Sequence, residues 1–80
     1  MTKDDWAAIG RFRTGLRCMT AGLDSKITVM GEHTIVVEVR KGWAKLSRVF
    51  GVSDIANSQN PEAFGEGVGE GMRDVLAQSY

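Results

Sequence analysis

The stretch PEAFGEGVGEGMRDVL places a glycine at every second position of a segment that also repeats apolar residues at helical spacing. The glycines are Gly65, Gly67, Gly69 and Gly71. The apolar residues with helical spacing are Phe64, Val68, Met72, Val75 and Leu76. Asn60 and Pro61 precede them as a capping residue and a proline suited to the first helical position. The pattern therefore predicts a C-terminal, glycine-rich amphipathic helix.

A phosphate-binding loop is excluded for these glycines. The dinucleotide fingerprint needs glycines at relative positions one, three and six, between a strand and a helix. Counting from Gly65, the sixth position is Glu70, and counting from Gly67 it is Met72. A Lys-Ser/Thr pair is missing from the stretch, and Glu66 and Glu70 would repel phosphate. Nucleotide chemistry therefore does not explain the glycines.

Each glycine inside a helix costs about 0.8–1 kcal/mol relative to alanine, so the four together need an offsetting contact. A neighbouring backbone that approaches closely provides one, and it belongs to the sheet, to the first helix or to a second copy. We favour packing within the chain, with an oligomer interface as the alternative. The surface concerned comprises Gly65, Gly67, Gly69, Gly71, Val68 and Met72. If the neighbour covers Gly67 and Gly71, the substitution Gly71→Leu should destabilise the protein.

The opposite side of this helix carries acids at four-residue spacing. They are Glu62, Glu66, Glu70 and Asp74. Such a stripe is typical of a solvated helix face, with an arginine-bearing partner surface as the alternative reading.

A first helix is predicted from about Lys3 to Ala21. Thr2 and Asp5 have the spacing of a capping box, and Gly22 is suited to the C-terminal stop. One face collects Trp6, Ile9, Phe12, Leu16, Met19 and Leu23.

The segments KITVM and TIVVEV alternate apolar and polar residues around a turn at Gly31, which predicts an antiparallel β-hairpin. The following segment, GWAKLSRVFGVSDIA, has two readings. We favour a third strand after the Lys41-Gly42 turn, because two strands alone are rarely stable. The alternative is a helix-turn-helix, to which Leu46 to Ala56 has a weak likeness: Gly51 would open the turn, but Pro61 shortens the second helix.

Charge is unevenly spread although the net charge is zero. Between positions 40 and 53 there are four bases and no acid, whereas positions 54 to 80 hold five acids and one base. The four bases are Arg40, Lys41, Lys45 and Arg48. A balanced total argues against bulk adhesion to nucleic acid, but this segment would contact phosphates if the helix-turn-helix reading held.

Two tryptophans lie near arginine, and these two residue types are enriched at the energetic centres of protein interfaces. Trp6 shares its side of the first helix with Arg13 and Arg17, and Trp43 follows Arg40-Lys41-Gly42. The predicted partner-binding residues are therefore Trp6, Arg13, Arg17, Arg40, Lys41, Trp43, Lys45 and Arg48. The alternative reading is that each tryptophan closes a small core.

No catalytic or metal-binding pattern stands out. His33 is the one histidine and falls in the predicted turn, without a cysteine or carboxylate at ligand spacing. Cys18 is the one cysteine and has no adjacent histidine to activate it. We therefore expect no enzyme activity, no cofactor and no metal.

A single cysteine and the lack of a long apolar run favour a cytoplasmic protein, or one in the host cytoplasm if it is viral. The early acids of MTKDDWAAIG argue against an export signal.

The expected fold is one small α+β domain over residues 1–80, with a helix, a β-hairpin or three-stranded meander, and the glycine-rich helix. The expected function is non-catalytic binding of another protein by a homo-oligomer, most simply a dimer. Small chains of this kind occur among phage and mobile-element proteins, as inhibitors of host defence or as adaptors. The alternative is a small nucleic-acid-binding regulator that uses the basic segment from Arg40 to Arg48. We expect no membrane association.

Overall fold

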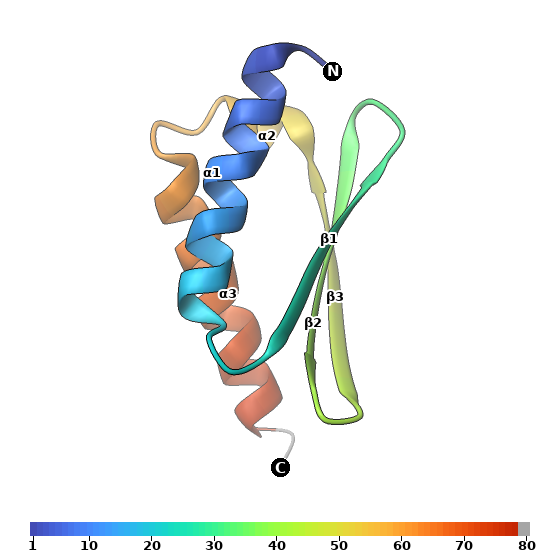
Figure 1. The fold of residues 1–80 in the computed structure, drawn as a ribbon, viewed down its shortest axis with the longest axis vertical. Coiled ribbons are helices and arrows are strands. Elements are labelled where there is room, and N and C mark those ends of the chain that lie inside the picture. The colour runs from blue at the N-terminus through green and yellow to red at the C-terminus, as the bar shows by residue number, and fades with distance from the viewer. Residues whose placement is uncertain (79–80) are drawn as a thin grey trace.

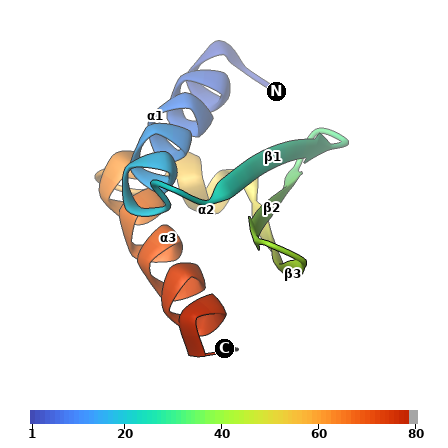
Figure 2. The same cartoon turned by 60° about the horizontal axis from the view of Figure 1, so that its bottom comes forward.

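A computed structural model describes residues 1–78 and confirms the predicted α+β class. The elements follow in the order α1 (Lys3–Met19), β1 (Asp24–Met30), β2 (Thr34–Lys41), β3 (Ala44–Gly51), α2 (Val52–Ala56) and α3 (Pro61–Gln78). The three strands form one antiparallel sheet in the order β1-β2-β3. Helices α1 and α3 lie on one side of this sheet, and no described helix covers its other face (Figures 1 and 2).

Helix α1 begins with the capping box that its sequence predicts. The N–H of Asp5 donates to Oγ1 of Thr2, and the N–H of Thr2 donates to Oδ2 of Asp5, both at 3.1 Å. The helix ends at Met19, two residues earlier than expected, and Thr20 is its C-cap: the N–H and the hydroxyl of Thr20 both donate to the carbonyl of Leu16, at 3.1 and 2.8 Å. Gly22, at φ +85°, then turns the chain toward β1.

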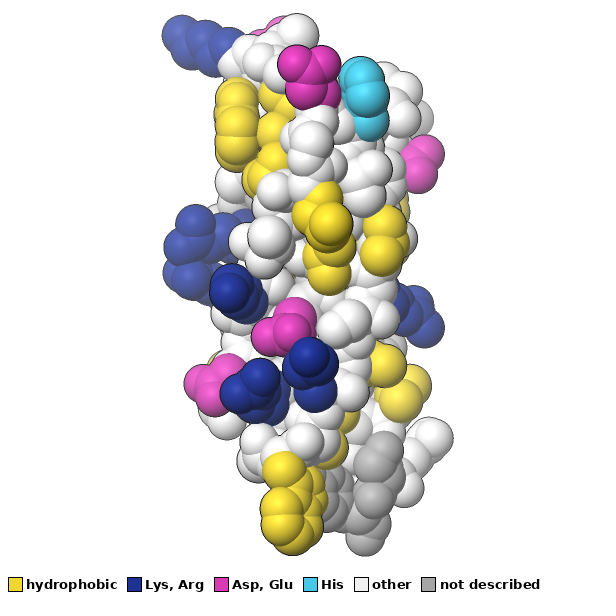
Figure 3. All heavy atoms as spheres, turned by 90° about the vertical axis from the view of Figure 1, so that its right-hand side faces the viewer, with side chains coloured by type: hydrophobic (Ala, Val, Ile, Leu, Met, Phe, Trp, Pro, Cys, Tyr) yellow, Lys and Arg dark blue, Asp and Glu magenta, His cyan; other side chains and the backbone are white. Residues whose placement is uncertain are grey.

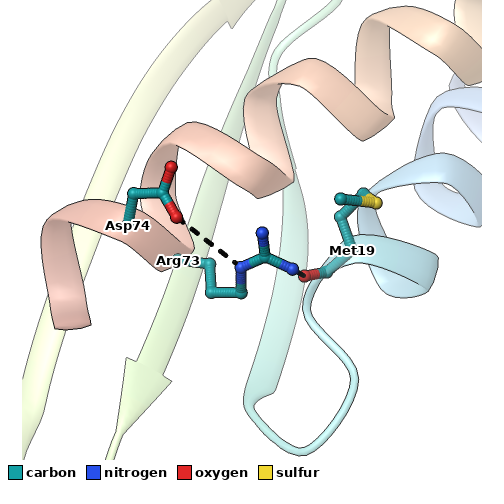
Figure 4. Close-up of polar contacts among 3 residues, drawn as sticks. All are labelled: Met19, Arg73 and Asp74. Carbon is teal, nitrogen blue, oxygen red and sulfur yellow. Dashed lines mark hydrogen bonds and ion pairs between the residues drawn. The ribbon is translucent and has the colours of Figure 1, made fainter.

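Helix α3 contributes a side chain that closes the end of α1. Nη1 of Arg73 donates to the carbonyl oxygen of Met19 at 3.4 Å, and its Nε lies 3.8 Å from Oδ1 of Asp74 (Figure 4). A cation at this position meets unsatisfied carbonyls at the negative end of the helix dipole. At the other end of α3, the N–H of Ala63 donates to Oδ1 of Asn60 at 3.2 Å, so Asn60 is the cap that the sequence predicts.

The predicted third strand is present, and the helix-turn-helix interpretation is wrong. Residues 46–51 belong to β3, and only the five residues of α2 follow as a helix. Arg48 made the strand ambiguous because it interrupts an apolar face. Its position opposite Val37 is on the helix side of the sheet, but β3 is an edge strand and Arg48 is exposed. An arginine at a sheet edge keeps its charge in water, so it does not disfavour the formation of the strand.

The core lies between the sheet and the helices. Phe12 is fully buried in it and packs against the half-buried rings of Phe50 and Phe64, and the three ring centroids are 5.5–5.9 Å apart. The helix-facing residues of the central strand β2 are fully buried, and α2 adds Val52 and Ile55. This arrangement explains the short helix α2: it covers the core where β3 ends, and the N–H of Val52 donates to the carbonyl of His33 at 2.8 Å.

Helices α1 and α3 touch backbone to backbone. A Cβ atom at Gly15 would overlap the carbonyl oxygen of Glu62, and one at Gly65 would overlap that of Phe12. A Cβ at Gly69 would lie 3.0 Å from the carbonyl oxygen of Leu16. Gly65 and Gly69 therefore face α1, whereas Gly67 and Gly71 do not: a Cβ at either meets no atom of the described chain within 4 Å. The expected destabilisation by Gly71→Leu thus has no basis within the chain.

This difference between the glycines predicts opposite effects of the same substitution. Gly65→Ala should lower the free energy of unfolding by about 1–3 kcal/mol, because the added methyl group forces the helices apart. Gly67→Ala should raise it by roughly 0.5–1 kcal/mol, because it adds helix propensity in open space. Urea unfolding followed by circular dichroism measures both. Equal effects of the two substitutions would contradict the backbone contact.

Candidate protein-binding surfaces

The residues predicted to bind a partner do not form one site. Trp6, Arg13 and Arg17 lie together on the flank of α1 that faces β1. The remaining residues lie on the sheet, with Arg40 and Lys45 on its bare face, Lys41 and Trp43 at the turn between β2 and β3, and Arg48 on the helix side. The structure therefore defines two separate surfaces, which we call the α1/β1 groove and the open sheet face.

The α1/β1 groove is a cleft of about 410 Å³. Its lining residues are Trp6, Ile9, Gly10, Arg13, Arg17, Ser25, Lys26, Ile27 and Val29. The contact at Gly15 draws one flank of α1 onto α3. Trp6, Arg13 and Arg17 recur at helical spacing on the other flank, which is consequently turned toward the edge of the sheet. The groove is thus a by-product of how the two long helices meet.

The groove is cationic above an apolar floor. Arg13, Arg17 and Lys26 make no ion pair with any residue between 1 and 78, and no acidic residue is part of the lining. Trp6 is 52% exposed although it is large and apolar. The sequence analysis missed Lys26, because on β1 it reads as an ordinary outward-facing polar residue. By its register opposite Glu38 it belongs to the open sheet face, and it reaches the groove only at the free edge of β1.

The open sheet face carries hydrophobic side chains that no other part of the described chain covers. Val49 is 67% exposed and Met30 is 58% exposed, while Val36 lies directly opposite Val49 in the register. The sequence holds a signal for two of them: Val36-Val37 and Val49-Phe50 are consecutive apolar pairs, and in a strand one member of such a pair must face away from the core. These three residues were not among the predicted site residues.

Charged side chains of both signs lie beside this apolar group. Nζ of Lys45 is 3.3 Å from Oε1 of Glu38, and Asp24 is opposite Arg40 on the neighbouring strand. Figure 3 shows hydrophobic side chains above a band in which basic and acidic side chains lie side by side. The bases Arg40 and Lys45 therefore lie among acids, not in a uniformly basic patch. Trp43, at the end of the sheet, is 92% exposed.

Groups that carry catalysis or hold metals are scattered. Within the described part of the chain, no three His, Cys, Asp or Glu residues gather as metal ligands would. Cys18 is exposed on α1, and His33 is exposed in the turn between β1 and β2. The acids Glu62, Glu70 and Asp74 are exposed on α3, and Glu66 is half-buried beside α1.

Comparison of the chain with protein-family models, with curated proteins and with solved structures gives no match. As far as residue 78, none of the helices is both long enough and apolar enough to cross a membrane. Function must therefore be argued from the two surfaces themselves.

Trp43 provides a test of whether exposed aromatic residues support the fold. Trp43→Ala should change the free energy of unfolding by less than about 0.5 kcal/mol, because its side chain contacts mainly water. Phe12→Ala, in the core cluster, should lower it by about 3–5 kcal/mol. Chemical unfolding of both variants gives the comparison. A large loss of stability on changing Trp43 would show that the tryptophan serves the fold and not a surface.

Proposed function

We propose that this protein is a non-catalytic protein-binding module that acts as a homo-oligomer through its open sheet face. The observation behind this proposal is the uncovered apolar group of Met30, Val36 and Val49 on a three-stranded sheet. Sheets in small domains bury one face, and an exposed apolar group on the second face is typical of an interaction site. A second copy of the same chain is the partner that best fits this face.

Two features favour a second copy. The band beside the apolar group contains Asp24 and Glu38 as well as Lys26, Arg40 and Lys45. A two-fold axis through the apolar group can therefore set cations of one copy against acids of the other, as isologous interfaces require. The zero net charge of the chain leaves no overall repulsion between copies.

The size of the sheet determines how strong a dimer through this face can be. A strand of eight residues is about 26 Å long, and three strands are roughly 10–15 Å wide. Two such faces in contact cover about 500–800 Å² in total, which is below the usual range for stable, specific interfaces. We therefore expect a weak dimer whose population depends on concentration.

The wider setting that we propose is a small inhibitor or adaptor of the phage or mobile-element kind, which binds another protein as well as its own copy. The compact fold and the second, separate surface in the α1/β1 groove are compatible with two simultaneous contacts. A nucleic-acid-binding regulator is the weaker candidate, because β3 occupies the segment of the alternative helix-turn-helix reading and the basic segment is divided between the two faces of the sheet.

The homo-oligomer is tested by the solution mass. Light scattering over a concentration series should show the mass rising from 8.7 kDa toward twice that value. Val49→Glu should shift the curve to higher concentration by about tenfold or more, because it places a charge in the apolar contact. Val49→Thr keeps the β-branched shape of the strand and should give a smaller shift.

Ala7→Glu is the matched control, since Ala7 is exposed on α1 away from the open sheet face. A monomer at every concentration would overturn the homo-oligomer. An equal shift for Ala7→Glu and Val49→Glu would place the interface elsewhere.

A further inference from the structure

We propose that the α1/β1 groove binds an extended, acidic segment of a partner protein, which adds to the sheet as a fourth strand beside β1. This inference rests on the proposed protein-binding role but not on the homo-oligomer, because the groove and the open sheet face are different surfaces.

Strand β1 lies at an edge of the sheet. In the order β1-β2-β3, strand β1 pairs only with β2 within the described chain. The N–H and C=O groups along its other edge are therefore available to a new strand, which is how extended peptides add to sheet edges. The seven residues of β1 set the length of the pairing segment at about the same number.

An apolar recess lies beside the unpaired edge of β1, between that strand and α1. Ile27 and Val29 of β1 line the groove together with Trp6 and Ile9 of α1. Side chains on the helix side of an added strand would enter this groove and cover Trp6, which is 52% exposed. An edge strand that has an apolar recess beside it gives specificity as well as backbone pairing.

The charge of the groove determines the chemistry of the segment. Arg13, Arg17 and Lys26 have no ion pair among the described residues, and the lining contains no acid. Carboxylates of a partner would meet Arg13 and Arg17 in the groove and Lys26 at its rim, with no acid in the lining to repel them. A basic or neutral segment would leave this charge unmatched.

The groove also has a direction. The turn between Met19 and Asp24 reverses the chain, so that Arg17 and Ser25 lie near the turn while Trp6 and Val29 lie far from it (Figure 1). The turn end is therefore basic and the far end is apolar. The fitting segment carries acids toward one end and aliphatic residues toward the other, at alternate positions.

The acids of a second copy fit less well. Its largest group of acids, Glu62, Glu66, Glu70 and Asp74, lies on the helix α3, whose backbone groups are already bonded within the helix. Such a helix could match the charge of the groove but could not pair with the edge of β1. An extended segment satisfies both features at once.

The test uses Trp6 as the reporter. The chain has two tryptophans, so Trp43→Phe leaves Trp6 as the sole one, and the 92% exposure of Trp43 makes this change harmless. The probe is a capped nine-residue peptide of alternating threonines, with two valines and then two glutamates at the positions between them. A copy in reversed order allows for parallel pairing.

We expect one of the two peptides to saturate a blue shift of the Trp6 fluorescence at up to about millimolar concentration. Replacing its glutamates with glutamines should weaken binding by about tenfold, and Arg13→Glu or Arg17→Glu should do the same. Arg11→Glu is the matched control on the same helix, because Arg11 is exposed and does not line the groove. It should change binding by less than about twofold. Methylating alternate backbone nitrogens of the peptide should abolish binding.

Several results would overturn the proposal. If neither peptide changes the fluorescence, the acidic segment is wrong. If the methylated peptide binds equally well, the added strand is wrong, and an equal loss in Arg11→Glu would show general charge attraction. A saturable response to single-stranded oligothymidine alone would assign the groove to nucleic acid. A response that appears only on raising the protein concentration would assign it to a second copy. The light-scattering result for Val49→Glu is read separately, so the homo-oligomer and the groove can fail independently.

Discussion

The backbone contact of α1 with α3, made at Gly15 and at Gly65, determines how the rest of the molecule is arranged. Because neither residue has a side chain, the backbones of α1 and α3 approach until the carbonyls of Glu62 and Phe12 fill the places that Cβ atoms would occupy. This approach brings the ring of Phe64 against that of the buried Phe12. It also fixes the rotation of α1 about its own axis, and so decides which of its residues face the edge of the sheet.

The two surfaces follow from different consequences of this packing. The groove exists because the flank of α1 opposite Gly15 is left beside β1, with Trp6 and two arginines on it. The open sheet face exists because three strands need only one covered side to contribute a core, and the helices all serve that side. Its apolar group arises because Val36 is adjacent to the core residues of β2 and Val49 is adjacent to Phe50 in β3, so that each points to the opposite face.

Local signals in the sequence were sufficient for α1, β1, β2 and α3, but the short helix α2 was not part of the expected fold. The Thr2 and Asn60 caps and the alternation around Gly31 involve neighbours in the chain, and such patterns survive without knowledge of the tertiary structure. The strand β3 was harder because Arg48 is explained only by its place at a sheet edge. The relevant pair of glycines could not be chosen from α3 alone, since glycines flank its apolar stripe on both sides.

The missing signal for that choice lies in α1. Ala8 and Gly15 are seven residues apart and both are buried, so they form a line of small residues that marks where a second helix can approach. Ala8 and Gly15 were not predicted to be the residues that Gly65 to Gly71 approach. The groove could not be predicted from local sequence patterns either. Its lining residues come from α1 and from β1, which meet only in the folded chain.

The contact of α1 with α3 also has a bearing on how the protein is made. The two glycines are fifty positions apart, and the helix that holds Gly65 is the last element of the described chain. During synthesis, α1 and the sheet emerge from the ribosome with their apolar faces uncovered, and they wait for α3 to complete the core. The domain therefore gains its full stability only after α3 has been synthesised, and nascent chains that stop before α3 would be natural substrates for chaperones and proteases.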